Sequence, residues 1–341
     1  ESRALNLRVY VNDRYGSHQT SDLSPQGMDR FIDDAVEMTR VLMPDTLRTL
    51  PDPALYAGRS TTDLGICDVA PAKLTTDGRK ARAMALHDKA RADTGDKVIS
   101  VEAGFSDRQS EWVRVHTNGF GDGDRSTSFS QWASVSAKDP SGRRPSDWAE
   151  AQARRLTDLA RPEETGAEAA RRTLAQIGAQ NMTSIKLPVI VEARAVGRVL
   201  GGLTAPLNGF SLSQKRSCMV DMLGKQIASP LLSITDDPLL HGGWASQRFD
   251  GEGLTTRRRP IIQAGVLKGF YIDTYYGKKL KKTPTGASSS NLVFSTGKRD
   301  LDALCAAAGK AILITRFIGG NSKSTTGDFS HGLFGFLIEK G

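Results

Sequence analysis

The sequence is typical of a globular protein with a basic surface. It has 341 residues, 38% hydrophobic and 25% charged, a length that predicts two domains with ample chain for a core. The net charge of +8 raises the question of a nucleic-acid or membrane partner. No nucleic-acid motif accompanies that charge, and no apolar run approaches the ~20 residues of a bilayer span. We therefore expect no membrane contact and no sequence-specific nucleic-acid binding.

Cysteine usage indicates the compartment. Cys67, Cys218 and Cys305 are odd in number and far apart, which favours a reducing environment over a disulfide framework. The predicted location is the cytoplasm. The basic runs 257–259 and 278–282 indicate solvated loop surface, with an acidic patch on a partner or a nucleic acid as the alternative.

The first 180 residues are expected to mix helices with antiparallel strands. Residues 1–20 predict a hairpin, with Asn12-Asp13 and Tyr15-Gly16 as turn residues. Proline and capping signals predict helices that start at Pro25 and that span residues 71–92, 146–160 and 162–178. Alternation of period two predicts strands over residues 98–105, 112–116 and 129–135. The strands would form an antiparallel meander with one solvated face.

The stretch 189–227 organises the rest of the chain. A short apolar run after Pro188 predicts a buried strand. The spacing i, i+3, i+4, i+7 then predicts an amphipathic helix with Val196, Val199, Leu200 and Leu203 on its inner face. Gly197 and Gly201 inside that helix indicate a break or a close backbone approach. A second helix is expected over residues 212–223. No catalytic side chain is evident on this unit.

Residues 231–341 are expected to be rich in strands and glycine. Turns are predicted at residues 250–253 and 263–265, a helix over 300–308, and strands over 270–276, 311–317 and 334–339. A glycine-rich loop, residues 319–332, is expected between the last two strands. The predicted fold class is α+β, with a mixed domain over 1–180 and a β-rich domain over 181–341. Both ends are expected to be truncated.

The strand and helix after Pro188, with the loop 319–332 and the strand that follows, resemble the TldD/PmbA family of bacterial and archaeal peptidase subunits. In the TldD type this segment carries a His-Glu-x-x-x-His zinc motif, which the PmbA type, also called TldE, lacks. Aligning Gly197 with the glycine before the second histidine places Ala193, Arg194 and Arg198 at the motif positions. The resemblance is therefore to the PmbA/TldE type without the zinc motif.

The resemblance implies a non-catalytic subunit that pairs with a TldD-like zinc metalloprotease subunit. The pair would cleave short or unfolded peptides, with zinc in the partner and no cofactor in this chain. The loop would lie near the groove that the two subunits share. Candidates for positioning a peptide or the partner are Gly319, Gly320, Asn321, Ser322, Asp328 and Ser330. A loop whose glycines serve only sharp turns is the alternative.

Two other functions stay open, a stand-alone homodimeric binding protein and a nucleic-acid-associated factor. A local zinc site is not expected, because the histidines are dispersed and no Cys-x-x-Cys or His-x-x-x-His occurs. A hydrolase triad is not expected either, since no Gly-x-Ser-x-Gly elbow is present. Cys218, beside Met219 on a predicted apolar helix face, is interpreted as a buried structural thiol. His331 is given no role.

Overall fold

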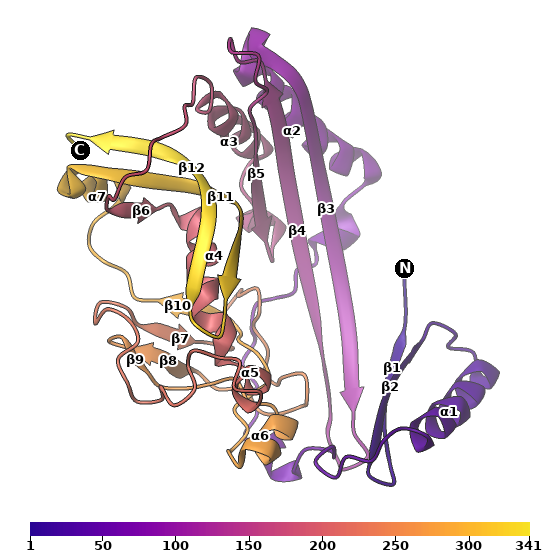
Figure 1. The fold of residues 1–341 in the computed structure, drawn as a ribbon. Coiled ribbons are helices and arrows are strands. Elements are labelled where there is room, and N and C mark those ends of the chain that lie inside the picture. The colour runs from indigo at the N-terminus through magenta and orange to yellow at the C-terminus, as the bar shows by residue number, and fades with distance from the viewer.

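The computed structural model describes residues 1–341, except for the side chain of Ala72. Helices and mainly antiparallel sheets occur together along the chain, so the α+β fold class is confirmed (Figure 1). Among the described helices, none has the length and apolar character that crossing a bilayer demands. The predicted boundary between residues 180 and 181 stays a prediction.

The N-terminal segment forms the predicted hairpin and helix. Strands β1 (Leu5–Val11) and β2 (Arg14–Thr20) pair across a turn in which Asn12 and Asp13 both have positive φ, the conformation that a two-residue hairpin turn needs. Helix α1 (Pro25–Arg40) starts at the predicted proline, and its N-cap hydroxyl accepts a hydrogen bond from the Gly27 amide.

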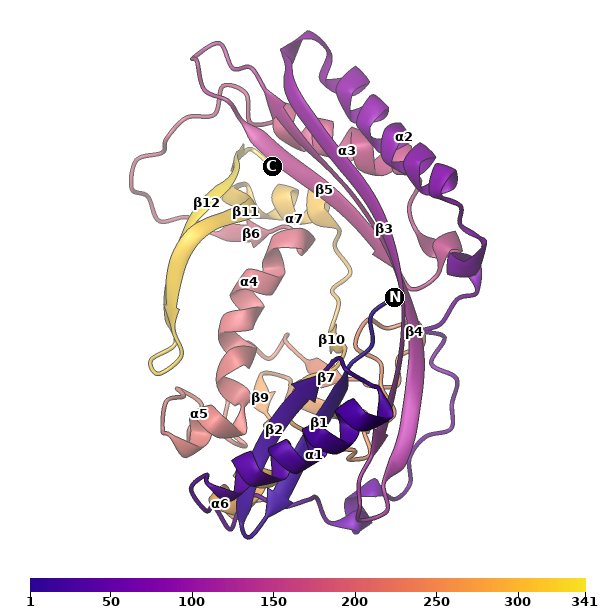
Figure 2. The same cartoon turned by 90° about the vertical axis from the view of Figure 1, so that its right-hand side faces the viewer.

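The central part is a long twisted sheet with two helices on one face. Strands β3 (Val98–Val115), β4 (Gly121–Ala137) and β5 (Ser146–Ala153) lie in that order. Helices α2 (Thr76–Thr94) and α3 (Pro162–Leu174) pack side by side against it (Figure 2). The core between them is built from small side chains: Ala90, Ala133, Val135, Ala149 and Ala169. This composition allows a close approach of helix to sheet.

Two predictions for this part were wrong. The strands expected over 98–105 and 112–116 are one continuous strand, β3. Residues 146–153, expected to be helical, form β5, where buried Asp147, Ala149 and Ala153 occupy alternate positions. The alanine-rich composition suggested a helix, but the burial period is two, because one face of β5 lies against α3.

The C-terminal part begins with β6 (Val189–Val191) and α4 (Ala193–Thr204), at the places predicted for a strand and a helix. The strand is not buried as predicted, since Val189 is 56% exposed. Strand β6 pairs in parallel with β11 (Lys310–Lys323), and β11 pairs with β12 (Asp328–Glu339). A second sheet has the order β10 (Leu292–Phe294), β7 (Ile234–Asp236), β8 (Arg259–Gln263), β9 (Val266–Leu267). The remaining α-helices are α5 (Gly209–Ser213), α6 (Thr274–Leu280) and α7 (Leu301–Ala308).

Single-turn 3-10 helices connect these elements. They are η1 (Pro53–Tyr56), η2 (Ala70–Lys73), η3 (Gly95–Lys97), η4 (Leu156–Asp158) and η5 (Ala205–Leu207).

Three further predictions need correction. The helix expected over 212–223 ends at Ser213, and Met219 lies beyond it in a turn, buried in the core. The strand expected over 270–276 is instead a buried segment followed by α6, because Asp273 caps a helix there. The expected loop 319–332 is largely strand, since β11 and β12 extend to a short turn between Lys323 and Asp328.

The glycines of α4 serve neither of the two expected purposes. The helix continues through Gly197 and Gly201, and a side chain built at either would meet no described atom within 4 Å. Gly166 on α3 differs, because a Cβ there would lie 2.5 Å from the Leu86 carbonyl oxygen on α2. Gly166 is therefore required for packing, whereas Gly197 and Gly201 are not.

This contrast gives a paired prediction. Replacing Gly197 with alanine should raise the free energy of unfolding by about 0.5–1 kcal/mol, because alanine favours a helix interior. Gly166→Ala should lower it by about 1–3 kcal/mol, because the helices must separate. Urea unfolding of both variants tests this, and a shift of the same sign in both would contradict the packing described.

Candidate functional site

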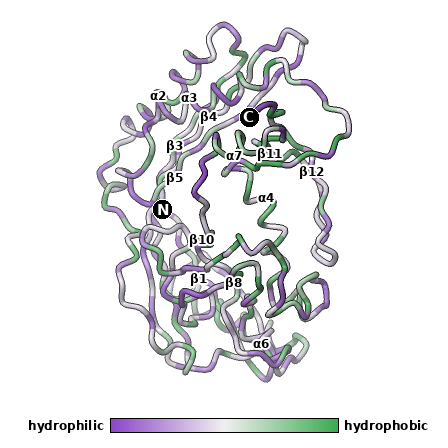
Figure 3. The backbone as a smooth tube through the Cα atoms, turned by 90° about the vertical axis from the view of Figure 1, so that its left-hand side faces the viewer, coloured by the Kyte–Doolittle hydropathy of each residue, from purple (hydrophilic) through white to green (hydrophobic). Residues whose placement is uncertain are grey.

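The three zinc-motif positions lie in the first two turns of α4. Ala193 and Arg194 open the helix and Arg198 follows one turn later. Ala195 alone is buried among its residues, although the helix is coloured mainly hydrophobic in Figure 3. An alanine methyl and two guanidinium groups offer no lone pair to a metal ion, so these positions cannot ligate zinc.

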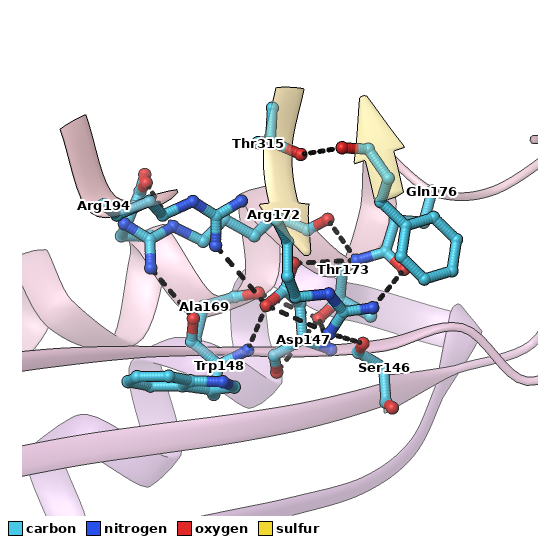
Figure 4. Close-up of polar contacts among 12 residues, drawn as sticks. Ser146, Asp147, Trp148, Ala169, Arg172, Thr173, Gln176, Arg194 and Thr315 are labelled. Carbon is cyan, nitrogen blue, oxygen red and sulfur yellow. Dashed lines mark hydrogen bonds and ion pairs between the residues drawn. The ribbon is translucent and has the colours of Figure 1, made fainter. Parts of the chain in front are cut away.

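Arg194 is held in an ion-pair network with a buried carboxylate. Its guanidinium lies 2.9 Å from Glu192 and 3.5 Å from Oδ1 of Asp147 on β5 (Figure 4). The Asp147 side chain is 2% exposed, and Arg316 from β11 lies 3.6 Å from the same oxygen. Two cations from separate elements thus converge on one buried anion.

Asp147 also forms hydrogen bonds with three neighbouring residues. Its Oδ1 accepts from the Trp148 amide at 2.9 Å, and its Oδ2 accepts from the Gln176 side chain at 2.8 Å. The Asp147 amide donates to the Thr173 hydroxyl on α3. These donors and positive charges compensate for the loss of water around the buried carboxylate.

The network links three parts of the fold. Asp147 belongs to the central sheet, while Arg194 and Arg316 belong to α4 and β11. A cavity of about 160 Å³ adjoins it, with Arg172, Thr315 and Phe334 in its wall. Nearby on α3, a hydrogen bond from Arg171 holds the pKa of Glu168 at about 2, so the Glu168 carboxylate is ionised at neutral pH. The ion pairs of Asp147 therefore link the central sheet to the C-terminal part.

Arg198 is exposed and, unlike Arg194, its side chain forms no ion pair or hydrogen bond with any of the described residues. Within the part of the chain that the structure describes, no group of three His, Cys, Asp or Glu side chains is placed to hold a metal ion. The three motif positions thus have different environments. Arg194 has a structural role and Arg198 is free to meet another molecule.

The other candidates lie on the β11–β12 hairpin. Gly319 and Gly320 form an irregularity in β11, where both have positive φ and a Cβ at Gly320 would lie 2.3 Å from the Ser330 carbonyl oxygen. Asn321 pairs with Ser330 across the hairpin. The remaining candidates are Ser322 on β11 and Asp328 on β12.

Local contacts fix the tip of this hairpin. Asp328 accepts a hydrogen bond of 2.6 Å from the Thr326 hydroxyl, and the Cys218 amide donates to the Ser324 carbonyl. Cys218 is half-buried in a turn, so the interpretation as a buried thiol on a helix face was wrong. No hydrogen bond or ion pair between described residues joins the hairpin candidates to Arg194 or Arg198. The two predicted groups are separate.

Strand β12 lies at the edge of its sheet and carries exposed apolar side chains. The sheet order is β12-β11-β6, so one side of β12 has no partner strand among the described residues. Phe329 is 62% exposed, and Leu333, Phe336 and Leu337 are each about 40% exposed. An edge of this kind offers backbone hydrogen bonds and apolar contacts to another extended chain.

Sequence reasoning did not find Asp147 or Arg316. The available signal was an acidic residue at an inward position of an alternating strand, and it was lost when residues 146–160 were assigned to a helix. The arginines lie far from Asp147 in the sequence, so no local pattern pairs them. Only the fold brings the three charges together.

Removing the buried charge should destabilise the protein. Asp147→Asn keeps an acceptor for the Trp148 amide but removes the anion that Arg194 and Arg316 share. Arg194 retains Glu192, whereas Arg316 has no other ion pair among the described residues, so the free energy of unfolding should fall by roughly 2 kcal/mol. The matched control Arg198→Gln, at an exposed and unpaired position, should stay within about 0.5 kcal/mol of the original protein. Equal melting temperatures for the two variants would refute the proposed role of Asp147.

Comparisons with known proteins agree with this geometry. The PmbA/TldA metallopeptidase central domain matches residues 70–177, and the C-terminal domain of the same family matches residues 184–341. The chain is 32% identical to Metalloprotease PmbA of Escherichia coli O157:H7, over 99% of this chain and 75% of that protein.

Solved structures have the same fold. A putative modulator of DNA gyrase from Bacteroides thetaiotaomicron superposes with a TM-score of 0.96 and 36% identity, covering 99% of this chain and 77% of that one. TldE from Thermococcus kodakarensis superposes with a TM-score of 0.84 over 99% of this chain and 78% of that one. At 19% identity, the second shows likeness of fold alone. This chain belongs to the PmbA/TldD metallopeptidase family.

Proposed function

We propose that this chain is the subunit without the zinc motif in a two-chain peptidase of the TldD/TldE type. The partner is a TldD-like chain that holds the zinc, and the substrate is a short or unfolded peptide. This chain contributes part of the peptide-binding groove. The observation that carries the proposal is the chemistry of the first turns of α4, where Ala193, Arg194 and Arg198 replace the ligands and the acid of the zinc motif.

The environment of Arg194 also supports the proposal that this chain is the subunit without the zinc motif. A general base must be free to reach a water molecule, whereas this position holds a guanidinium paired with Glu192 and Asp147. In the proposed complex, zinc in the partner would activate the water that attacks the peptide carbonyl. The residues of this chain bind and orient the peptide.

The edge of β12 is the proposed contribution to peptide binding. An extended peptide that adds to a sheet edge gains main-chain hydrogen bonds, which do not depend on its side chains. Exposed Phe329 and Leu333 supply apolar contacts on the same strand. Asp328 and Ser330 lie at its start and could bind polar groups of the peptide. Such recognition suits unfolded peptides of varied sequence.

Co-expression with a TldD-like chain from the same source tests the partnership. Co-purification at a fixed stoichiometry supports the proposal. A stable homodimer that does not bind the TldD-like chain would favour the alternative, a stand-alone binding protein.

The isolated chain should contain no stoichiometric zinc. The expectation follows from the absence of a lone-pair donor at Ala193, Arg194 and Arg198. Elemental analysis of protein purified without chelator or affinity metal measures this directly. One equivalent of zinc per chain would refute the assignment of this chain as the metal-free subunit.

A charge on the β12 edge should weaken peptide binding. Leu333→Lys places an ammonium group on a side chain that is 40% exposed, so stability should change by only about 0.5 kcal/mol. In the complex, the KM for an unfolded peptide should rise about tenfold with little change in kcat. The control Leu231→Lys, at a side chain 88% exposed outside the hairpin, should leave KM unchanged. Equal kinetics for the two variants would exclude the β12 edge.

A further inference from the structure

A second cavity, remote from the zinc-motif positions in the sequence, lies between the segment around η1 and the second sheet of the C-terminal part. Its volume is about 380 Å³, within the range of small-molecule sites. Exposed Arg257, Thr283 and Ser288 surround its mouth, while buried Asp250 and Leu254 form deeper parts of its wall. It is therefore a pocket that runs from the surface to a buried acid.

Asp250 is a buried acid that forms no ion pair among the described residues, although Arg114 donates to its backbone carbonyl at 3.0 Å and its charge partly offsets the burial. The side chain is 5% exposed, and Oδ1 accepts from the amides of Glu252 and Leu254 at 2.8 and 3.0 Å. The other oxygen, Oδ2, has no hydrogen-bond partner within the described atoms that meets normal geometry. Burial raises the pKa of Asp250, which reflects the cost of its only partly compensated charge.

Arg257 is the complementary charge in the same wall. It is exposed, and among the described residues no ion pair or side-chain hydrogen bond engages its guanidinium. The adjacent Arg258 differs, since it lies 3.2 Å from Asp237 and is not part of the wall. The cavity thus presents one unpaired charge of each sign.

Backbone pairing limits how far apart these two residues lie. The Asp250 amide donates to the Leu254 carbonyl, and Phe249 pairs with Thr255. Arg257 comes three positions after Leu254, and three residues of chain span at most about 10 Å. Two or three extended residues cover about 7–10 Å. The separation therefore suits the two charged termini of a very short peptide.

We propose that this cavity binds a zwitterionic di- or tripeptide, with its ammonium group toward Asp250 and its carboxylate at Arg257. Thr283 and Ser288 lie at the mouth as hydroxyl donors for the peptide carbonyls, and Leu254 offers an apolar contact. The inference goes beyond the proposed partnership and concerns this chain alone. Binding here can therefore fail while co-purification succeeds, and the reverse also holds.

Calorimetric titration of the isolated chain with four forms of alanyl-leucine tests the proposal. The forms are the free dipeptide, its N-acetyl derivative, its C-terminal amide, and the derivative blocked at both ends. The free dipeptide should bind about tenfold or more tightly than either singly blocked form, since a hydrogen bond to a charged group is worth that much. Equal affinity for all four forms, or no binding at millimolar concentration, would overturn the proposal.

Two variants assign the ends of the peptide. Asp250→Asn keeps the carbonyl oxygen that caps the Glu252 and Leu254 amides, so it should fold, and it should lose the preference for a free N-terminus only. Arg257→Gln should lose the preference for a free carboxylate only. The controls Asp237→Asn and Arg258→Gln, outside the cavity wall, should retain both preferences. The proposed site would be contradicted if the controls behaved like the cavity variants. It would also be contradicted if neither cavity variant changed the preference for free over blocked termini.

Discussion

The buried carboxylate of Asp147 determines how the central sheet meets the C-terminal part. Moving a carboxylate out of water costs several kcal/mol, and this cost is offset only where opposite charges and donors surround it. Here the compensation comes from Arg194 on α4 and Arg316 on β11, together with Gln176 in the turn after α3. Because all must stay close to one oxygen pair, the start of α4 is fixed even though Ala195 is the one fully buried residue of that helix.

This constraint changes how the zinc-motif positions should be understood. Arg194 is part of the connection between two sheets, so the position is occupied by a residue with a structural role of its own. Substituting an acid there would place it against Glu192 and Asp147. The charges around this position therefore disfavour the glutamate of the zinc motif. The peptide binding proposed for the β12 edge, and for the cavity of Asp250 and Arg257, requires no metal in this chain.

Local signals in the sequence were enough to predict part of the fold. The Asn12–Asp13 turn, the proline that starts α1 and the unit of β6 and α4 all depend on residues close in the chain. The β5 strand was missed because its alanines resemble a helix, and its burial period appears only once α3 covers it. The hairpin at 319–332 was missed because its glycines suggested a loop, whereas pairing with β12 makes the segment a strand.

The candidate site was predictable to the same limited extent. The missing zinc ligands can be recognised from a single segment, whereas the Asp147 network joins residues from three distant segments. The same holds for the cavity. Only the folded chain shows that Oδ2 of Asp250 and the Arg257 guanidinium line one cavity without hydrogen-bond partners among the described residues.

The central claim is that this chain acts in peptide cleavage only through a zinc-bearing partner. The most direct measurement follows cleavage of an unfolded peptide by this chain, by the TldD-like chain and by their mixture, each at equal zinc concentration. The account predicts that the mixture cleaves rapidly and that this chain alone has no activity. Cleavage by this chain alone, or a mixture no faster than the TldD-like chain, would contradict it.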